Sequence, residues 1–176
     1  AEWSIRQATG AQTIYYKAQF LVDPQAKVDE LPPSGEITKP TLSAPQQAAA
    51  NALIERAMSR SADNETFARE LIKTLNDPDS QNAALILNDF DRTDALHKIL
   101  LTAGVQSKTV GVIELEDGRR RQTIQPMVQV WSGDKWVLFS PNSEQAAAQP
   151  NLLVWDESNV SLLEQEGGKN NKTDLP

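Results

Sequence analysis

The spacing of the apolar residues changes at Gly104, and this change limits the folds open to the chain. Before Gly104, apolar residues recur every three or four positions, as they do on the buried face of an α-helix. After it, apolar and polar residues alternate, and the Asp117-Gly118 pair between two such runs is a hairpin signal. Helices followed by hairpin-linked strands predict an α+β fold, with N-terminal helices packed on a C-terminal antiparallel sheet.

Capping residues mark where each element begins and ends. Asp63 and Asp91 are suited to cap helices, and Gly104 is suited to end one. Helices are expected at residues 46–60, 63–75, 81–87 and 91–103. Strands are expected at residues 12–22, at 108–115, 121–131 and 135–140 as a meander, and at 152–155 and 160–163.

The prolines and the polar C-terminus divide the chain into four parts. Five of its ten prolines fall between residues 23 and 45, where they leave few amide donors for strand pairing. The expected parts are a strand segment at 1–22, a Pro-rich linker at 23–45, an α+β domain at 46–164 and a polar flexible tail at 165–176. Because the chain begins without Met, we expect a processed or excised fragment whose missing flanks hold a membrane anchor.

Composition excludes several classes of function. The chain has no Cys, which removes disulfides, zinc ribbons, iron–sulfur clusters and any thiol nucleophile, and the lone His97 cannot build a multi-histidine metal site. The net charge of −7 and the pI of about 4.8 argue against binding of nucleic acid. We therefore expect no metal, no cofactor and no nucleic-acid partner. The apolar runs are also far too short to cross a bilayer.

A few residue types could still carry chemistry, and each has a plainer alternative. His97 could serve as a general base, but its setting favours a surface or boundary residue of a helix. Arg119 and Arg121 share a face and could hold a carboxylate, or they could be the solvated charges of an edge strand. The tryptophans could line a ligand groove, although large aromatics more often fill the core. They are Trp3, Trp131, Trp136 and Trp155.

Three stretches resemble the transglutaminase-like proteins of the papain-like cysteine protease superfamily. LLTAGVQSKTV at residues 100–110 is similar to the pattern that joins their nucleophile helix to the sheet. MVQVW at 127–131 and KWVLFSP at 135–141 are similar to their HAW and DPT strands. The resemblance implies a transglutaminase-like fold.

The resemblance also implies that this chain has lost the catalytic triad. The His position falls on Gln125, the Asp position on Ser140, and the Cys position near Asp89 to Asp91. Gln125 cannot exchange protons, Ser140 supplies no charge, and the chain has no thiol to attack a carbonyl. The chain departs from the pattern at Met127 too, where Trp is expected. We therefore expect a protein that is not an enzyme.

Nearly the whole chain resembles one narrower family, the bacterial inactive transglutaminases fused to seven transmembrane helices. The matching stretches are GAQTIYY at 10–16, RSAD at 60–63, LEDGRRRQ at 115–122, NLLVW at 151–155 and SLLEQEGGKN at 161–170. Membership implies a periplasmic domain of an inner-membrane protein, attached through flanking helices that are missing here. It also implies two neighbouring gene products as partners, an ATP-grasp glutamate-ligase-like protein and a retropepsin-like protease.

Two functions remain open from the sequence. The first is a non-catalytic domain that binds a peptide or protein partner and couples it to the membrane helices. Its candidate binding residues are Gln125, Trp131, Trp136, Ser140, Arg119 and Arg121. The alternative is a purely structural scaffold for a membrane complex with the ligase-like and protease-like proteins.

Overall fold

The computed structural model describes residues 32–116, 123–147 and 151–157. Its helices are α1 (Ala44–Met58), α2 (Asn64–Leu75), α3 (Gln81–Leu87) and α4 (Arg92–Thr102). Its strands are β1 (Ser107–Glu114), β2 (Ile124–Trp131), β3 (Trp136–Phe139) and β4 (Leu152–Glu157). The α+β class is confirmed. The strands predicted at 12–22 and 160–163 and the tail at 165–176 lie outside the described residues.

The caps explain why the helices begin where they do. Asp63 accepts the amide hydrogen of Thr66 at 2.7 Å, and Asp91 accepts that of Asp94 at 2.9 Å. In α1, Pro45 lies in the first turn, and Gln46 Oε1 accepts the backbone N–H of Ser43 at 2.9 Å. This helix begins at Ala44, so its first residues fall inside the range that we assigned to the Pro-rich linker.

The transition from helix to sheet depends on Gly104. Its φ of 81° is in the left-handed region, where a residue without Cβ is favoured. The amide hydrogens of Gly104 and Val105 then bond to the carbonyls of Leu101 and Leu100, at 3.1 and 2.9 Å. This pattern is a Schellman motif, and it turns the chain from α4 directly into β1.

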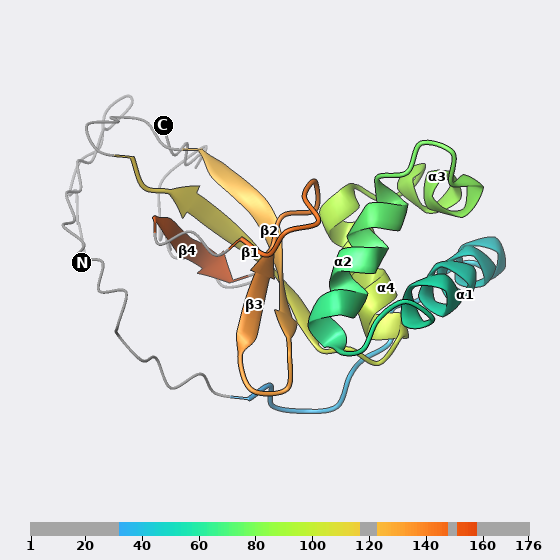
Figure 1. The fold of residues 1–176 in the computed structure, drawn as a ribbon, viewed down its shortest axis with the longest axis horizontal. Helices are drawn as coiled ribbons and strands as arrows, with labels where there is room; N and C mark the ends of the chain where they lie inside the picture. The colour runs from blue at the N-terminus through green and yellow to red at the C-terminus, as the bar shows by residue number, and fades with distance from the viewer. Residues whose placement is uncertain (1–31, 117–122, 148–150, 158–176) are drawn as a thin grey trace, which may run out of the picture.

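The four strands form one antiparallel sheet in the order β3-β2-β1-β4. The predicted meander of β1, β2 and β3 is therefore confirmed, and β4 adds to the outer side of β1. Figure 1 shows α2 and α4 beside the sheet and α1 and α3 beyond them, so the helices form two layers on one side. Helix α1 packs on α2 and α3, whereas α2 and α4 reach the strands.

The two faces of the sheet bury different clusters. Val130 and Phe139 join the main core with the helices, and both are fully buried. Val110, Val112 and Met127 form a second, smaller cluster. Because side chains alternate along a strand, and the register sets Val110 opposite Met127, this second cluster lies on the face that points away from the helices.

Candidate functional site

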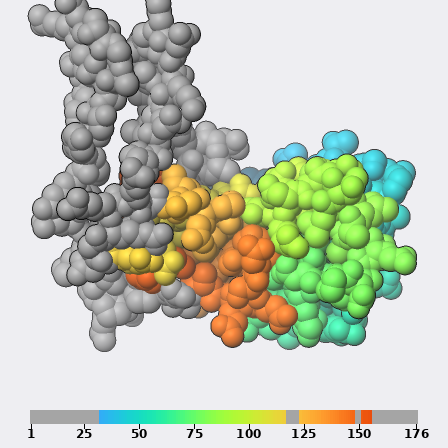
Figure 2. Space-filling view, turned by 90° about the horizontal axis from the view of Figure 1, so that it is seen from above, coloured from blue at the N-terminus to red at the C-terminus, as the bar shows by residue number. Residues whose placement is uncertain are grey.

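A hollow of about 390 Å³ opens where the N-terminus of α4 meets the ends of β2 and β3. Its apolar wall comes from four side chains, Leu87, Phe90, Pro126 and Pro141. These residues come from the end of α3, the α3–α4 connection, the start of β2 and the turn after β3. In Figure 2, the orange surface around and after β3 lies directly against the green surface of the helices.

Asn76, the C-cap residue that follows α2, holds the parts of this hollow together. Its Nδ2 donates to the carbonyl oxygens of Ile72 and Pro141, each at 3.0 Å. Its Oδ1 accepts from Nε of Arg92, also at 3.0 Å. One amide therefore fixes the end of α2, the turn after β3 and the first residue of α4 relative to one another.

Polar groups of the α4 N-terminus form the rest of the rim. Asp91 and Arg92 line the hollow together with Asn142 from the opposite side. The Oδ1 atom of Asp91 is engaged as the helix cap. The position that the resemblance assigns to a nucleophile, near Asp89 to Asp91, thus lies at the start of α4, on the rim of the hollow.

The structure brings Gln125 and Ser140 to the same end of adjacent strands, but neither residue lines the hollow. Gln125 is exposed and pairs with Val112 of the second cluster, so it projects on the face away from α4. Ser140 follows β3, and its Oγ accepts the amide hydrogen of Asn142 at 3.4 Å. The hollow is instead lined by the next residue along the chain in each case, Pro126 and Pro141.

The other candidate binding residues lie elsewhere. Trp131 and Trp136 meet edge to face at the far end of the β2–β3 hairpin, with ring centroids 5.4 Å apart. Nζ of Lys108 lies 4.8 Å from the ring centre of Trp136. Trp131 is five positions along the extended strand from Pro126, a distance of roughly 16 Å, so the aromatic pair and the hollow are distinct. Arg119 and Arg121 lie outside the described residues.

The expectation that the tryptophans fill the core is wrong for those that the structure describes. Trp131, Trp136 and Trp155 are half-buried, and none of them belongs to the buried core. Trp131 and Trp136 pair with each other at the end of a hairpin, not with the residues of the core. Trp3 lies outside the described residues.

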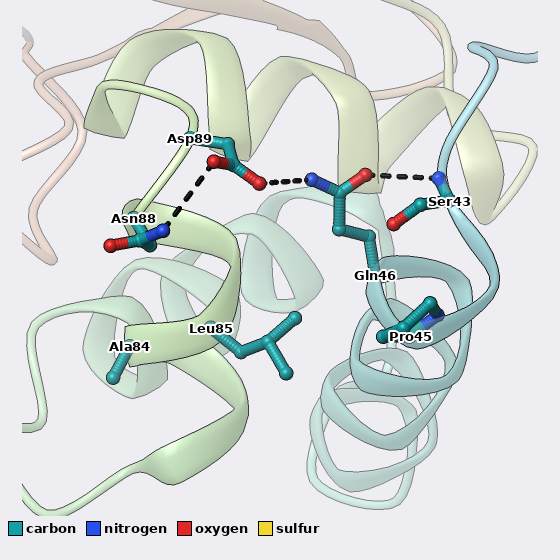
Figure 3. Close-up of a pocket in the computed structure, with 7 residues that line it drawn as sticks. All are labelled: Ser43, Pro45, Gln46, Ala84, Leu85, Asn88 and Asp89. Carbon is teal, nitrogen blue, oxygen red and sulfur yellow. Dashed lines mark hydrogen bonds between the residues drawn. The ribbon is translucent and has the colours of Figure 1, made fainter.

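A second hollow, of about 530 Å³, lies between the start of α1 and the end of α3. Figure 3 shows the Gln46 side chain crossing it, with Oε1 toward Ser43 and Nε2 toward Asp89. The bond from Gln46 Nε2 to Asp89 Oδ2 is 2.7 Å long. It joins α1 to the α3–α4 connection, the same segment whose next residues line the first hollow.

His97 is a boundary residue of α4, as its setting in the sequence predicted. The ring is half-buried, and its Nδ1 lies 2.9 Å from Oγ of Ser107, at the start of β1. Burial lowers the pKa of the imidazole below its ordinary value, the charge of Lys98 lowers it further, and Asp94 opposes both. The bond to Ser107 was not foreseen, because no local pattern relates these two positions.

The described residues contain neither a cluster of metal ligands nor a membrane-spanning helix. No group of three or more His, Cys, Asp or Glu side chains there is arranged to hold a metal ion. The longest helix in that part of the chain, α1, has 15 residues, and none of its helices has the length and hydropathy of a membrane span.

Comparison with known proteins identifies a family. The family model described as inactive transglutaminase fused to 7 transmembrane helices matches residues 1–90, just over half of the 176 residues. The match ends one residue before the cap of α4. No curated protein and no solved structure matches the chain. Because the family model covers more than half of the sequence, the chain belongs to the family of inactive transglutaminases fused to seven transmembrane helices.

Proposed function

We propose that this chain is a non-catalytic, transglutaminase-like domain that binds a peptide or protein partner and couples its binding to membrane helices. Membership of a family fused to transmembrane helices supports attachment to a membrane. Placement of the domain on the periplasmic side of a bacterial inner membrane is part of the proposal. It follows from the family resemblance of the sequence.

The observation that carries the proposal is the hollow at the start of α4. In a thiol acyltransferase of this superfamily, the nucleophile stands at a helix start facing the ends of neighbouring strands. Here the start of α4 lies beside the ends of β2 and β3, with an open hollow between them, and this arrangement supports the proposal. A site once shaped for a peptide can keep its groove after the reacting groups are gone, since peptide affinity comes from pockets and main-chain pairing.

The chemistry of the residues present supports binding without turnover. The chain has no Cys, and the triad positions proposed from the resemblance hold Gln125 and Ser140. Neither side chain can act as a general base near neutral pH or orient an imidazole by charge. We propose these two positions as the remnants of the His and Asp sites.

Blocking the hollow tests the proposal. Asn142→Trp places a large ring at an exposed position of its rim, whereas Gln145→Trp adds the same ring at an exposed position outside it. We expect the first variant to lose partner binding and the second to keep it. The measurement is recovery of crosslinked peptide or protein from the intact membrane protein, with a photo-reactive residue at Pro126. Equal recovery from both variants would contradict the proposal.

A second function, a structural scaffold, is supported by the exposed apolar side chains of the outer helices. Met58 of α1 is 52% exposed and Leu85 of α3 is 41% exposed. Under this alternative, the outer helices contact other proteins, and the ligase-like and protease-like gene products are the proposed partners. Photo-reactive residues at Met58 and Leu85 then capture partners, while the residue at Pro126 captures none. Capture at Pro126 alone favours peptide binding.

A further inference from the structure

Arg92 occupies a position that its own helix disfavours. It is the first residue of α4, and the N-terminus of a helix carries partial positive charge that opposes a cation there. Asp94, in the first turn, offsets this only in part. Residues that run against a local preference are concentrated at functional sites, where another interaction compensates for them.

The orientation of Arg92 is fixed by a neutral partner. Its Nε donates to Asn76 Oδ1 at 3.0 Å, and Asn76 is itself held by two further hydrogen bonds. Within the described residues, the guanidinium forms no ion pair. A guanidinium has five N–H donors, so the two Nη groups keep their donors for another partner.

The surroundings of Arg92 define the chemistry of that partner. Phe90, Pro126 and Pro141 give the hollow an apolar wall, and Nζ of Lys98 lies 5.1 Å from the ring centre of Phe90. The carboxylate of Asp91 also lines the hollow, but its Oδ1 is engaged by the helix. A planar, oriented guanidinium beside an apolar wall matches a carboxylate adjacent to an apolar side chain.

We infer that the hollow binds a peptide carboxylate through Arg92, with Asn76 as the positioning residue that fixes the guanidinium. The inference rests on the proposed peptide-binding function. The carboxylate belongs either to the C-terminus of the peptide or to an acidic side chain next to an apolar residue. Asn76 does not touch the ligand and acts only by holding Arg92 and the turn at Pro141.

Matched peptides test the inference on the 176-residue chain. The probes are octapeptides of Ala, Pro and Phe with an uncharged N-terminal dansyl label and one internal Glu or Gln, each made as a C-terminal acid and a C-terminal amide. Fluorescence polarisation gives their affinities. We expect at least one acidic form to bind about tenfold more tightly than the fully neutral form, as a charge-assisted hydrogen-bonded pair allows. The four forms show whether the terminal or the side-chain carboxylate is recognised.

Variants test whether Arg92 and Asn76 cause the tighter binding of the acidic peptides. Arg92→Gln removes the preference for the acidic peptide, whereas Arg60→Gln, the same change at an exposed residue beyond the end of α1, leaves it intact. Asn76→Ala reduces the preference for the acidic peptide about threefold, because the guanidinium of Arg92 is no longer held in one orientation. Asn76→Asp abolishes it, because the new carboxylate pairs with Arg92. A purely structural role for Asn76 would instead weaken the acidic and neutral peptides equally.

Each remaining outcome is decisive. Peptides that bind equally well in acidic and neutral forms overturn the inference and leave the proposed function standing. Absence of binding by every peptide also overturns the inference, and crosslinking with the Asn142→Trp and Gln145→Trp variants then decides the proposed function separately. Thermal unfolding of each variant identifies any that fails to fold, and Arg92→Lys then supplies the second test. This variant keeps the charge but lacks the planar fork, so it retains only part of the preference.

Discussion

The side chain of His97 forms a direct contact between helix α4 and the sheet. It projects from α4 and meets Ser107, which opens β1 and is itself buried. Its pKa is lowered chiefly because burial disfavours the charged imidazole. The folded state therefore binds a proton at this residue less readily than the unfolded chain does.

This difference predicts a pH dependence of stability. Above the ordinary pKa of about 6.5, both states hold a neutral ring, and His97 contributes nothing to the pH dependence. As the pH falls below that value, the unfolded chain takes up the proton first, so the free energy of unfolding decreases. We expect the chain to lose more stability between pH 7.5 and 5.5 than His97→Gln does, in urea titrations at each pH. An equal loss in both proteins would assign the effect to other groups.

At the level of secondary structure, the capping residues allowed most of the fold to be predicted from the sequence. The side chains of Asp63 and Asp91 cap the helix that directly follows each of them, and the backbone of Gly104 ends the helix directly before it. Their effect is therefore local and can be predicted from the sequence. The contacts of Asn76 were not predicted, because its partners Pro141 and Arg92 lie 65 and 16 residues away. The periodicity of apolar residues gives no information about hydrogen bonds between segments that are far apart in the sequence.

The cap of α4 gives a prediction at this scale. Asp91→Ala removes the acceptor for the amide of Asp94 and is expected to cost about 1 kcal/mol of stability. Asp91→Asn keeps a cap acceptor and is expected to change stability little. Chemical denaturation of the two variants distinguishes loss of the cap from loss of the charge. If both variants lose the same stability, the charge of Asp91 and not its cap is responsible.

The link between α1 and the α3–α4 connection gives a second prediction. Gln46 is buried and bonds to both Ser43 and Asp89, so Gln46→Ala is expected to cost about 1 to 2 kcal/mol. The side chain of its neighbour Gln47 bonds to Asn51 at the surface, and Gln47→Ala is expected to cost less than about 0.5 kcal/mol. Urea unfolding curves supply both values, and a similar cost for the two variants would contradict the assigned role of Gln46.

At the scale of the whole molecule, Phe139 joins the sheet to the helical layers. It ends β3, is fully buried, and belongs to the same core as residues of all four helices. Phe139→Ala is expected to cost roughly 3 to 5 kcal/mol, because it leaves a cavity at this junction. Ile124→Ala, at an exposed position of β2, should change stability by no more than about 0.5 kcal/mol. Denaturant unfolding measures both, and a small loss for Phe139→Ala would mean that the helices and sheet unfold separately.

The α+β class and the order of the elements followed from the sequence, but the site followed only in part. The resemblance placed a helix start and two strand ends together, and these elements do surround the hollow. It selected Gln125 and Ser140, whereas Pro126, Pro141 and Arg92 line the hollow. Which of two adjacent strand residues faces a helix depends on the register of the sheet, and this register is set by packing across segments far apart in the chain.

The three hydrogen bonds of Asn76 give the molecule an internal spectroscopic probe. Both hydrogens of its side-chain amide point to carbonyl oxygens, so its nitrogen–proton resonances should be separated from those of solvated asparagines. A molecule that enters the hollow and displaces the Pro141 turn would shift these resonances without touching Asn76. Isotope labelling of asparagine alone would therefore make occupancy visible in a spectrum.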